Sequence, residues 1–329
     1  MGSVRISGTG SYLPKKVVTN FDLEKIVDTT DEWIVQRTGI RERRYADPDE
    51  ATSDLAKKAS VRALKAANMR PEDLDLIILA TITPDTCCPA GANWLQAKLG
   101  APNAVSFDIT AACTGFIFAL SMAQQYLQNG RHNNALVVAA EVLSRTLNWA
   151  DRGSCILWGD AAGAAILEKS EQGAEVLSVH IHSDGSAGRN LLLPSGGSAT
   201  TPITEASVKE GRHFLAMVDA NKTFKVAVKR FAESCEEAAA HNGYDISDID
   251  LIIPHQANLR ILRAFGERLK VPVEKIFVNI DKYGNTSAAT VPVALDEAVR
   301  SGRIRPGSKV ILTAFGGGLT WGSSLIRWH

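Results

Sequence analysis

Short, continuous apolar runs alternate with helical segments along the chain. The stretch "KAANMRPEDLDLII" (65–78) shows the pattern well, because the end of a helix, an acidic turn and an apolar strand follow one another. Strands that are apolar at every position, separated by helices, are typical of parallel sheets covered by helices. We therefore predict an α/β fold of mixed, mainly parallel sheets packed in layers with helices.

The same pattern occurs twice. Residues 65–78 align without gaps with "AHNGYDISDIDLII" (240–253), at an offset of 175. Downstream, "FDIT" is matched by "FVNI" (277–280) and "GAAIL" by "GSSLI" (322–326). We predict two repeated βαβαβ-type halves, residues 1–172 and 173–329, that pack as one body. The segment 184–210, rich in Gly, Ser and Thr, reads as a long excursion loop.

Three polar residues follow predicted strands. Cys113 stands in "FDITAACTGFIFAL" (107–120), where an apolar strand turns into an apolar helix. An offset of 172 places it opposite Asn285 in "YGNTSAATVPVALDEAV", and His255 follows the strand that ends at Ile253. Because ligands of parallel α/β sheets collect at the carboxyl ends of the strands, we expect the three side chains to converge.

Each of the three has a plainer interpretation. A thiol at a helix N-terminus has a lowered pKa and can act as a nucleophile, but free cysteines are often simply buried. His255 suits a base or a hydrogen-bond donor, or a satisfied core histidine. Asn285 suits a helix N-cap. Their meeting at related positions favours a site. Gly316, Gly317 and Gly318 would offer N–H groups to an oxyanion there, or form a turn.

Composition narrows the possible partners. The 329 residues carry 36 basic and 36 acidic side chains, which gives no reason to expect nucleic acid or a membrane as a general partner. Five cysteines without a C-x-x-C spacing, no signal pattern and no membrane-length apolar run predict a reduced, cytoplasmic protein. "GTGSYLP" and "GDAAGAA" fit no phosphate-loop or dinucleotide fingerprint. Arg260, Arg263, Arg268 and Lys270 form either a solvated helix face or a surface for an acidic protein.

These motifs together resemble the β-ketoacyl-acyl carrier protein synthase III family, the initiating condensing enzymes of bacterial fatty acid synthesis, which have a thiolase-like fold. The resemblance covers nearly the whole chain. It rests on the stretch from "GTGSYLP" to "GIRERR" (8–44), "AACTGF", "DRGSCILWGDAAGAA", "PHQANLR", "YGNTSAAT" and "AFGGGLTWGSSLIRW". The set of Cys, His and Asn separates the family from the elongating synthases, which use two histidines.

The resemblance implies a role for each site residue. Cys113 would take an acyl group from acyl-CoA, and malonyl-acyl carrier protein would then lose CO2 to give an enolate that attacks the acyl-enzyme. His255 and Asn285 would donate hydrogen bonds to the enolate oxygen, and the amides of Cys113 and Gly317 would hold the oxyanion. The expected CoA contacts are Trp33, Arg37, Arg152 and Asn258, and the expected carrier-protein contacts are Gln256, Ala257, Asn258, Leu259 and Arg260. The family forms homodimers, with no permanently bound cofactor and no metal.

The chain departs from the family pattern in two informative places. Cys88 stands where many relatives have Phe, which walls the acyl pocket across the dimer, so we expect longer or branched primers. "MVDANKTFK" (217–225) lacks a glycine and is one residue longer than the usual pantetheine-contacting motif. Alternatives remain: a related condensing enzyme of secondary metabolism, a cysteine-dependent thioester hydrolase, or a non-catalytic acyl-binding relative.

Overall fold

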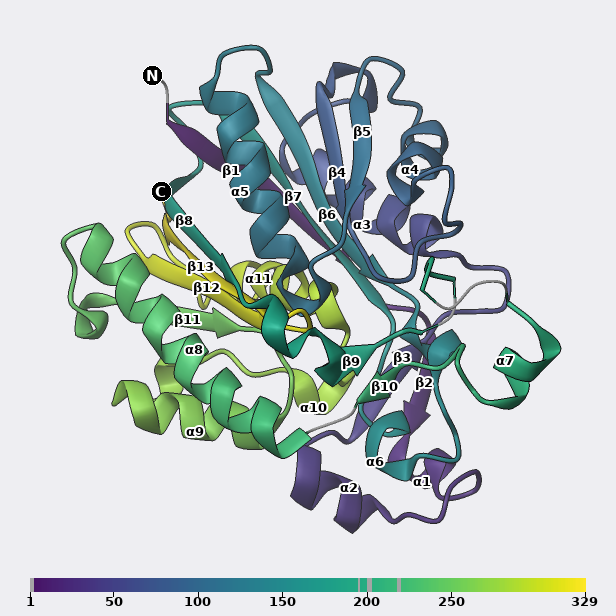
Figure 1. The fold of residues 1–329 in the computed structure, drawn as a ribbon. Coiled ribbons are helices and arrows are strands. Elements are labelled where there is room, and N and C mark those ends of the chain that lie inside the picture. The colour runs from purple at the N-terminus through teal and green to yellow at the C-terminus, as the bar shows by residue number, and fades with distance from the viewer. Residues whose placement is uncertain (1–2, 195, 200–202, 218–219) are drawn as a thin grey trace.

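A computed structural model describes residues 3–194, 196–199, 203–217 and 220–329. Within these ranges the main sheet has nine strands in the order β11-β12-β13-β8-β1-β7-β6-β4-β5 (Figure 1). These strands are β1 (Val4–Tyr12), β4 (Leu76–Ala80), β5 (Val105–Ile109), β6 (Asn134–Glu141), β7 (Ala161–Lys169), β8 (Ala174–Ser183), β11 (Leu251–Pro254), β12 (Lys309–Gly316) and β13 (Thr320–Arg327). Two small ribbons pair β2 (Lys16–Thr19) with β3 (Glu42–Tyr45) and β9 (Leu191–Leu192) with β10 (Ala216–Met217).

The helices are α1 (Asn20–Leu23), α2 (Asp31–Thr38), α3 (Thr52–Ala66), α4 (Gly91–Leu99), α5 (Gly115–Gln128), α6 (Arg152–Cys155), α7 (Glu205–Lys209), α8 (Ala220–His241), α9 (Leu259–Leu269), α10 (Ile280–Tyr283) and α11 (Thr290–Arg300). Short 3-10 turns are η1 (Pro71–Asp73), η2 (Ala112–Thr114), η3 (Leu143–Thr146), η4 (Gly185–Asn190), η5 (Ile246–Asp248), η6 (Val273–Lys275) and η7 (Ser287–Ala289). Among the described helices, none is long and apolar enough to cross a membrane.

The core is layered. One hydrophobic cluster joins α5 and α11 to strands of both halves, a second packs α3 and α4 on the outer face of the first half, and a third packs α8 and α9 on the outer face of the second (Figure 1). The two halves of the sheet meet at β1 and β8, where Arg5 pairs with Glu175 and Ile6 with Ala174. The predicted α/β fold of mixed sheets in layers with helices is confirmed. In the main sheet the pairings β4–β5, β4–β6 and β11–β12 are parallel and the other five are antiparallel.

The internal repeat is visible in the strand register. Ile77 pairs with Ser106 in the parallel β4–β5 ladder, and the matching Ile252 pairs with Ile276 in an isolated parallel bridge. In the second half, the counterpart of β5 is thus reduced to a single bridge, at the place that the repeat predicts. The turn 170–173 joins β7 to β8 at the expected boundary, and the division into domains at 172/173 stays a prediction.

Two details differ from expectation. The segment 184–210 is not wholly a loop, since η4, β9 and α7 lie in it, and residues 195 and 200–202 fall outside the described ranges. The repeat alignment of the two junctions was also wrong by three residues. Ala112 and Ser287 each open a 3-10 turn with a left-handed φ, of +46° and +50°. Cys113 therefore corresponds to Ala288 rather than to Asn285, because α10 lengthens the second junction.

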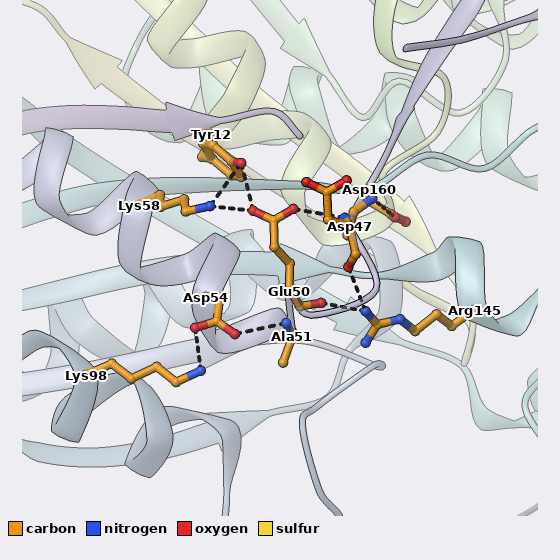
Figure 2. Close-up of polar contacts among 10 residues, drawn as sticks. Tyr12, Asp47, Glu50, Ala51, Asp54, Lys58, Lys98, Arg145 and Asp160 are labelled. Atoms are coloured by element: carbon orange, nitrogen blue, oxygen red, sulfur yellow. Dashed lines mark hydrogen bonds and ion pairs between the residues drawn. The ribbon is translucent and has the colours of Figure 1, made fainter. Parts of the chain in front are cut away.

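A polar network fixes the loop 46–51 beside the start of β7 (Figure 2). Glu50 forms an ion pair with Lys58, and Arg145 donates to the Glu50 carbonyl at 2.7 Å. The Asp160 carboxylate accepts from the amide of Ala46 at 2.8 Å. Asp160 immediately precedes β7 and closely follows the segment that borders the cavity described next. The network therefore holds the chain in place just beyond that segment.

Candidate active site

A cavity of about 560 Å³ lies between the two halves of the chain. Cys113, His255, Asn285 and Gly317 all line it. Cys113 lies in η2 after β5, His255 directly after β11, and Gly317 directly after β12. Asn285 lies two residues after α10 and not, as expected, at the end of a strand. The structure therefore brings together the residues that the sequence analysis expected to converge.

The Cys113 turn is tightly enclosed. The thiol residue is only 5% exposed, and α5 begins two residues later at Gly115. A Cβ atom on Gly316 would lie 2.8 Å from the Cys113 amide nitrogen, so only glycine allows the end of β12 to approach this turn. Thr320 is hydrogen-bonded to Thr114 and also donates to the Ala111 carbonyl at 3.2 Å. The β12–β13 connection is thereby fixed against the turn that carries Cys113.

Burial opposes the expected lowering of the pKa of Cys113. Desolvation raises the pKa of this thiol to about 12, because a thiolate would have to form inside the protein. The expectation of a thiol made acidic by the helix N-terminus is therefore not met in the free protein. The thiol is therefore protonated at neutral pH, and any reaction of its sulfur must displace this proton.

His255 is neutral and anchored at one side of its ring. It is 2% exposed, and burial lowers its pKa to about 3. Its backbone amide donates to the Thr313 carbonyl at 2.8 Å, and its Nδ1 lies 2.6 Å from the hydroxyl of Thr290. Its Nε2 has no hydrogen-bond partner within the described part of the chain, so this nitrogen is free to interact with a ligand.

Asn285 has its amide oxygen occupied and its amide nitrogen free. Oδ1 accepts from the Ser287 amide at 2.9 Å, and this donor fixes the orientation of the side-chain amide. The backbone N–H of Asn285 donates to the Leu157 carbonyl at 2.8 Å, and the Asn285 carbonyl accepts from the Gly159 amide at 3.0 Å. The bond to Ser287 is an Asx turn and not the predicted helix N-cap, because Thr286 and Ala289 hold the N-cap positions of η7 and α11. Nδ2 remains a donor without a partner among the described residues.

Two backbone N–H groups complete the arrangement. In the described ranges, no hydrogen bond runs from the amide of Cys113 or of Gly317 to another residue. Cys113 is buried and Gly317 is half-buried, and both line the cavity. Two such N–H groups offer the kind of donor pair that an oxyanion requires.

Comparison with known proteins agrees with this geometry. Two models, described as 3-oxoacyl-[acyl-carrier-protein (ACP)] synthase III and its C-terminal part, match residues 107–185 and 239–328. A relative from Caldanaerobacter subterraneus subsp. tengcongensis, named beta-ketoacyl-[acyl-carrier-protein] synthase III, is 52% identical over 98% of this chain and 97% of its own length. The chain belongs to the 3-oxoacyl-[acyl-carrier-protein] synthase III family.

Solved structures give the same result. The 3-oxoacyl-[acyl-carrier-protein] synthase III of Aquifex aeolicus VF5 superposes with a TM-score of 0.90 at 45% identity, covering 99% of this chain and 100% of that one. The priming β-ketosynthase of the R1128 polyketide pathway has a TM-score of 0.91 at 36% identity, covering 99% and 96%. The Aquifex aeolicus protein shares more of the sequence with this chain than the R1128 synthase does, although both share the fold.

Three of the expected CoA residues, Trp33, Arg37 and Asn258, line the cavity, and Arg152 lies beside Trp33. The Cζ of Arg37 is 4.5 Å and that of Arg152 4.9 Å from the centre of the Trp33 ring. Arg152 also donates to the Asp28 carbonyl at 2.8 Å. Asn258 donates to the Arg37 carbonyl at 3.1 Å and caps α9. All four expected residues are therefore close together.

The expected carrier-protein contacts need one correction. Gln256 is only 1% exposed. Its side-chain amide donates to the carbonyls of Pro254 and Phe277 and accepts from the backbone amide of Asn279. Its side chain is therefore structural and cannot reach a protein partner. Ala257, Asn258 and Leu259 are half-buried, and Arg260 is exposed.

Cys88 does not line the cavity within this chain. It is exposed, next to the equally exposed Cys87. In the 217–225 stretch, Met217, Phe224 and Lys225 line the cavity, while residues 218–219 lie outside the described ranges. Among the described residues, no group of three or more His, Cys, Asp or Glu side chains could hold a metal ion.

Sequence reasoning missed a buried carboxyl group. Glu141, the last residue of β6, is fully buried and accepts from the hydroxyls of Thr81 and Thr83 at 3.1 and 2.6 Å. Burial raises its pKa to about 7. The buried Ser287 hydroxyl is near enough to lower the pKa of both Glu141 and Cys113 but is in hydrogen-bonding geometry with neither. An acidic residue that ends the apolar run "ALVVAAE" was the available signal.

Proposed function

We propose that this protein condenses an acyl-CoA primer with malonyl-acyl carrier protein to give 3-oxoacyl-acyl carrier protein, CoA and CO2, and so initiates fatty acid synthesis. One observation carries the proposal: a thiol, a neutral imidazole and a free amide donor line one cavity beside two unpartnered backbone N–H groups. Family membership supports it independently.

In the acylation step the Cys113 sulfur attacks the thioester carbonyl of acyl-CoA. The amides of Cys113 and Gly317 stabilise the negative charge on the carbonyl oxygen. The carbon–sulfur bond to CoA then breaks. The thiol proton ends on the CoA sulfur, and an acyl-Cys113 thioester remains.

In the condensation step malonyl-acyl carrier protein enters and loses CO2. His255 and the Nδ2 of Asn285 donate hydrogen bonds to the thioester oxygen, which becomes the enolate oxygen. A neutral imidazole suits this task, because it places a donor there without a charge in a buried site. The enolate carbon attacks the acyl group, and the Cys113 sulfur leaves and takes up a proton.

The four expected CoA residues would bind the CoA nucleotide. Trp33 offers an aromatic face, and Arg37 and Arg152 offer charge for phosphates. An adenine between Trp33 and Arg152 requires Arg152 to move away from the ring, because 4.9 Å leaves no room for a second ring. Arg260, with Ala257, Asn258 and Leu259, would contact the acidic carrier protein. Acyl-CoA acts as a substrate, and the reaction requires no permanently bound cofactor.

A cytoplasmic homodimer is the proposed working form. β5 is the outermost strand of the sheet, and Val105 on it is 54% exposed, which leaves an edge for a second copy (Figure 1). Cys88 would reach an acyl pocket only across such an interface. Because it is smaller than Phe, we expect longer or branched primers to be accepted. Turnover of acetyl-CoA equal to or better than that of the longer acyl-CoAs would contradict this.

Intact-protein mass spectrometry tests the proposed function. The protein is mixed with acetyl-, butyryl-, isobutyryl- and octanoyl-CoA, and malonyl-acyl carrier protein is then added. We expect an acyl adduct that is discharged into a 3-oxoacyl product on the carrier. Release of free acid instead would indicate a thioester hydrolase, stable binding without an adduct would indicate a non-catalytic relative, and transfer to CoA rather than to the carrier would favour secondary metabolism.

A further inference from the structure

His255 has an unusual anchor for an imidazole in a catalytic site. The only hydrogen bond of its ring within the described residues is between Nδ1 and the Thr290 hydroxyl, at 2.6 Å. A carboxylate or backbone carbonyl at this place would force the proton onto Nδ1. A hydroxyl can either donate or accept, so the tautomer of His255 depends on what else Thr290 bonds.

The Thr290 hydroxyl has two acceptors and one proton. Besides His255 Nδ1, the Ser287 carbonyl lies 3.0 Å from Thr290 Oγ1. The backbone N–H of Thr290 also donates to this carbonyl. The Ser287 carbonyl therefore keeps a partner when the hydroxyl turns away, whereas a bare Nδ1 would have none.

The proposed role of His255 decides between the two arrangements. A neutral imidazole carries one proton, so an Nε2 that donates to a ligand leaves Nδ1 as an acceptor. The Thr290 hydroxyl, 2.6 Å from Nδ1, is then its donor. Thr290 is 3% exposed and is the first residue of α11, so its side chain has little freedom to choose another partner.

We propose that the Thr290 hydroxyl donates to Nδ1 and thereby holds His255 in the tautomer whose Nε2 carries the proton. Thr290 is thus a positioning residue for the decarboxylation step, and this inference rests on the proposed function. Nε2–H then points its donor at the enolate oxygen, together with Nδ2 of Asn285. Acylation of Cys113 does not need this donor and is independent of Thr290.

Three variants test the inference. Thr290→Val removes the hydroxyl with little change of shape, and Thr290→Ser keeps it. Thr313→Val is the matched control, because Thr313 is equally buried beside His255 but its hydroxyl bonds to Ser234 and Gly322. The tautomer is read by long-range ¹H–¹⁵N correlation on protein labelled at histidine, with His255→Gln to assign the signals. Acyl-enzyme formation and malonyl decarboxylation are followed separately.

We expect wild type, Thr290→Ser and Thr313→Val to show Nε2–H on His255 and a hydrogen-bonded Nδ1. In Thr290→Val the Nδ1 signal should shift, and decarboxylation should fall about tenfold, the equivalent of one hydrogen bond of roughly 1.4 kcal/mol. Acylation should stay within about twofold. Either of two results overturns the inference. One is Nδ1–H on His255 in the wild type, which can be read even if Thr290→Val fails to fold. The other is normal decarboxylation by a folded Thr290→Val. If the proposed function fails instead, the wild type forms no acyl adduct and the tautomer is still read.

Discussion

The two strand-to-helix junctions of this chain share a backbone shape but carry different side chains. In both, a 3-10 turn opens with a left-handed residue, Ala112 or Ser287, and leads into a buried helix, α5 or α11. The first turn presents Cys113. The second presents only Ala288 at the matching place, and its polar group, Asn285, stands three residues earlier beside the inserted α10. The repeat thus supplies the geometry twice, and local differences divide the chemistry between the halves.

The largest effect should come from removing the thiol of the first junction. Cys113→Ala should abolish the acyl adduct, lowering condensation by at least about a thousandfold, because no other group in the cavity can form the thioester. The measurement is intact-protein mass spectrometry with acyl-CoA. Cys235→Ala is the control, since burial also raises the pKa of Cys235 to about 12 but that thiol does not line the cavity. An adduct on Cys113→Ala would contradict the assignment.

The buried Glu141 behind both junctions should make stability depend on pH. Its pKa is about 7 in the folded protein and near 4.5 when exposed, so the folded state binds the extra proton in this interval. The stabilisation is complete below about pH 4.5 and is lost as the pH rises through 7, a change of roughly 3 kcal/mol. The free energy of unfolding in urea, measured from pH 4.5 to 8, checks this. A wild-type profile parallel to that of Glu141→Gln would refute it.

A smaller effect should follow from crowding the first junction alone. Gly316→Ala would place a methyl group 2.8 Å from the Cys113 amide, shifting the turn and one oxyanion donor. We expect the acylation rate to fall about tenfold and stability to fall by roughly 1–3 kcal/mol. Gly197→Ala, with no atom within 4 Å of the added Cβ, should change neither. Equal rates for the two variants would show that the turn is less constrained than described.

The smallest effect should be the response of the two left-handed residues to glycine. Ala112→Gly and Ser287→Gly each relieve backbone strain of about 1 kcal/mol but add freedom to the unfolded chain. Both should therefore change the free energy of unfolding by less than about 1 kcal/mol, and by similar amounts. Urea unfolding of the two variants side by side would show whether the turns are energetically equivalent.

Much of this architecture could be predicted from the sequence. The apolar runs at 76–80 and 251–254 and the repeat offset located the strands and the carboxyl ends that carry Cys113 and His255, and Asn285 meets them from the end of α10. The three-residue error between the junctions arose because α10 has no counterpart in the first half. The pKa of Cys113 was misjudged because a helix N-terminus is visible in the sequence, whereas complete desolvation by the opposite half is not. The inward bonds of Gln256 and the burial of Glu141 likewise depend on distant segments.

The division of chemistry between the halves is tested most directly by Asn285→Ala, with acylation and decarboxylation measured separately. Acyl-Cys113 should form within about threefold of the wild-type rate, because its oxyanion donors are backbone amides. Release of CO2 from malonyl-acyl carrier protein and discharge of the acyl group should fall about 10²–10³-fold, as when one oxyanion donor is removed. If both steps fall together in a folded variant, or if discharge is unaffected, the two junctions do not divide the reaction in this way.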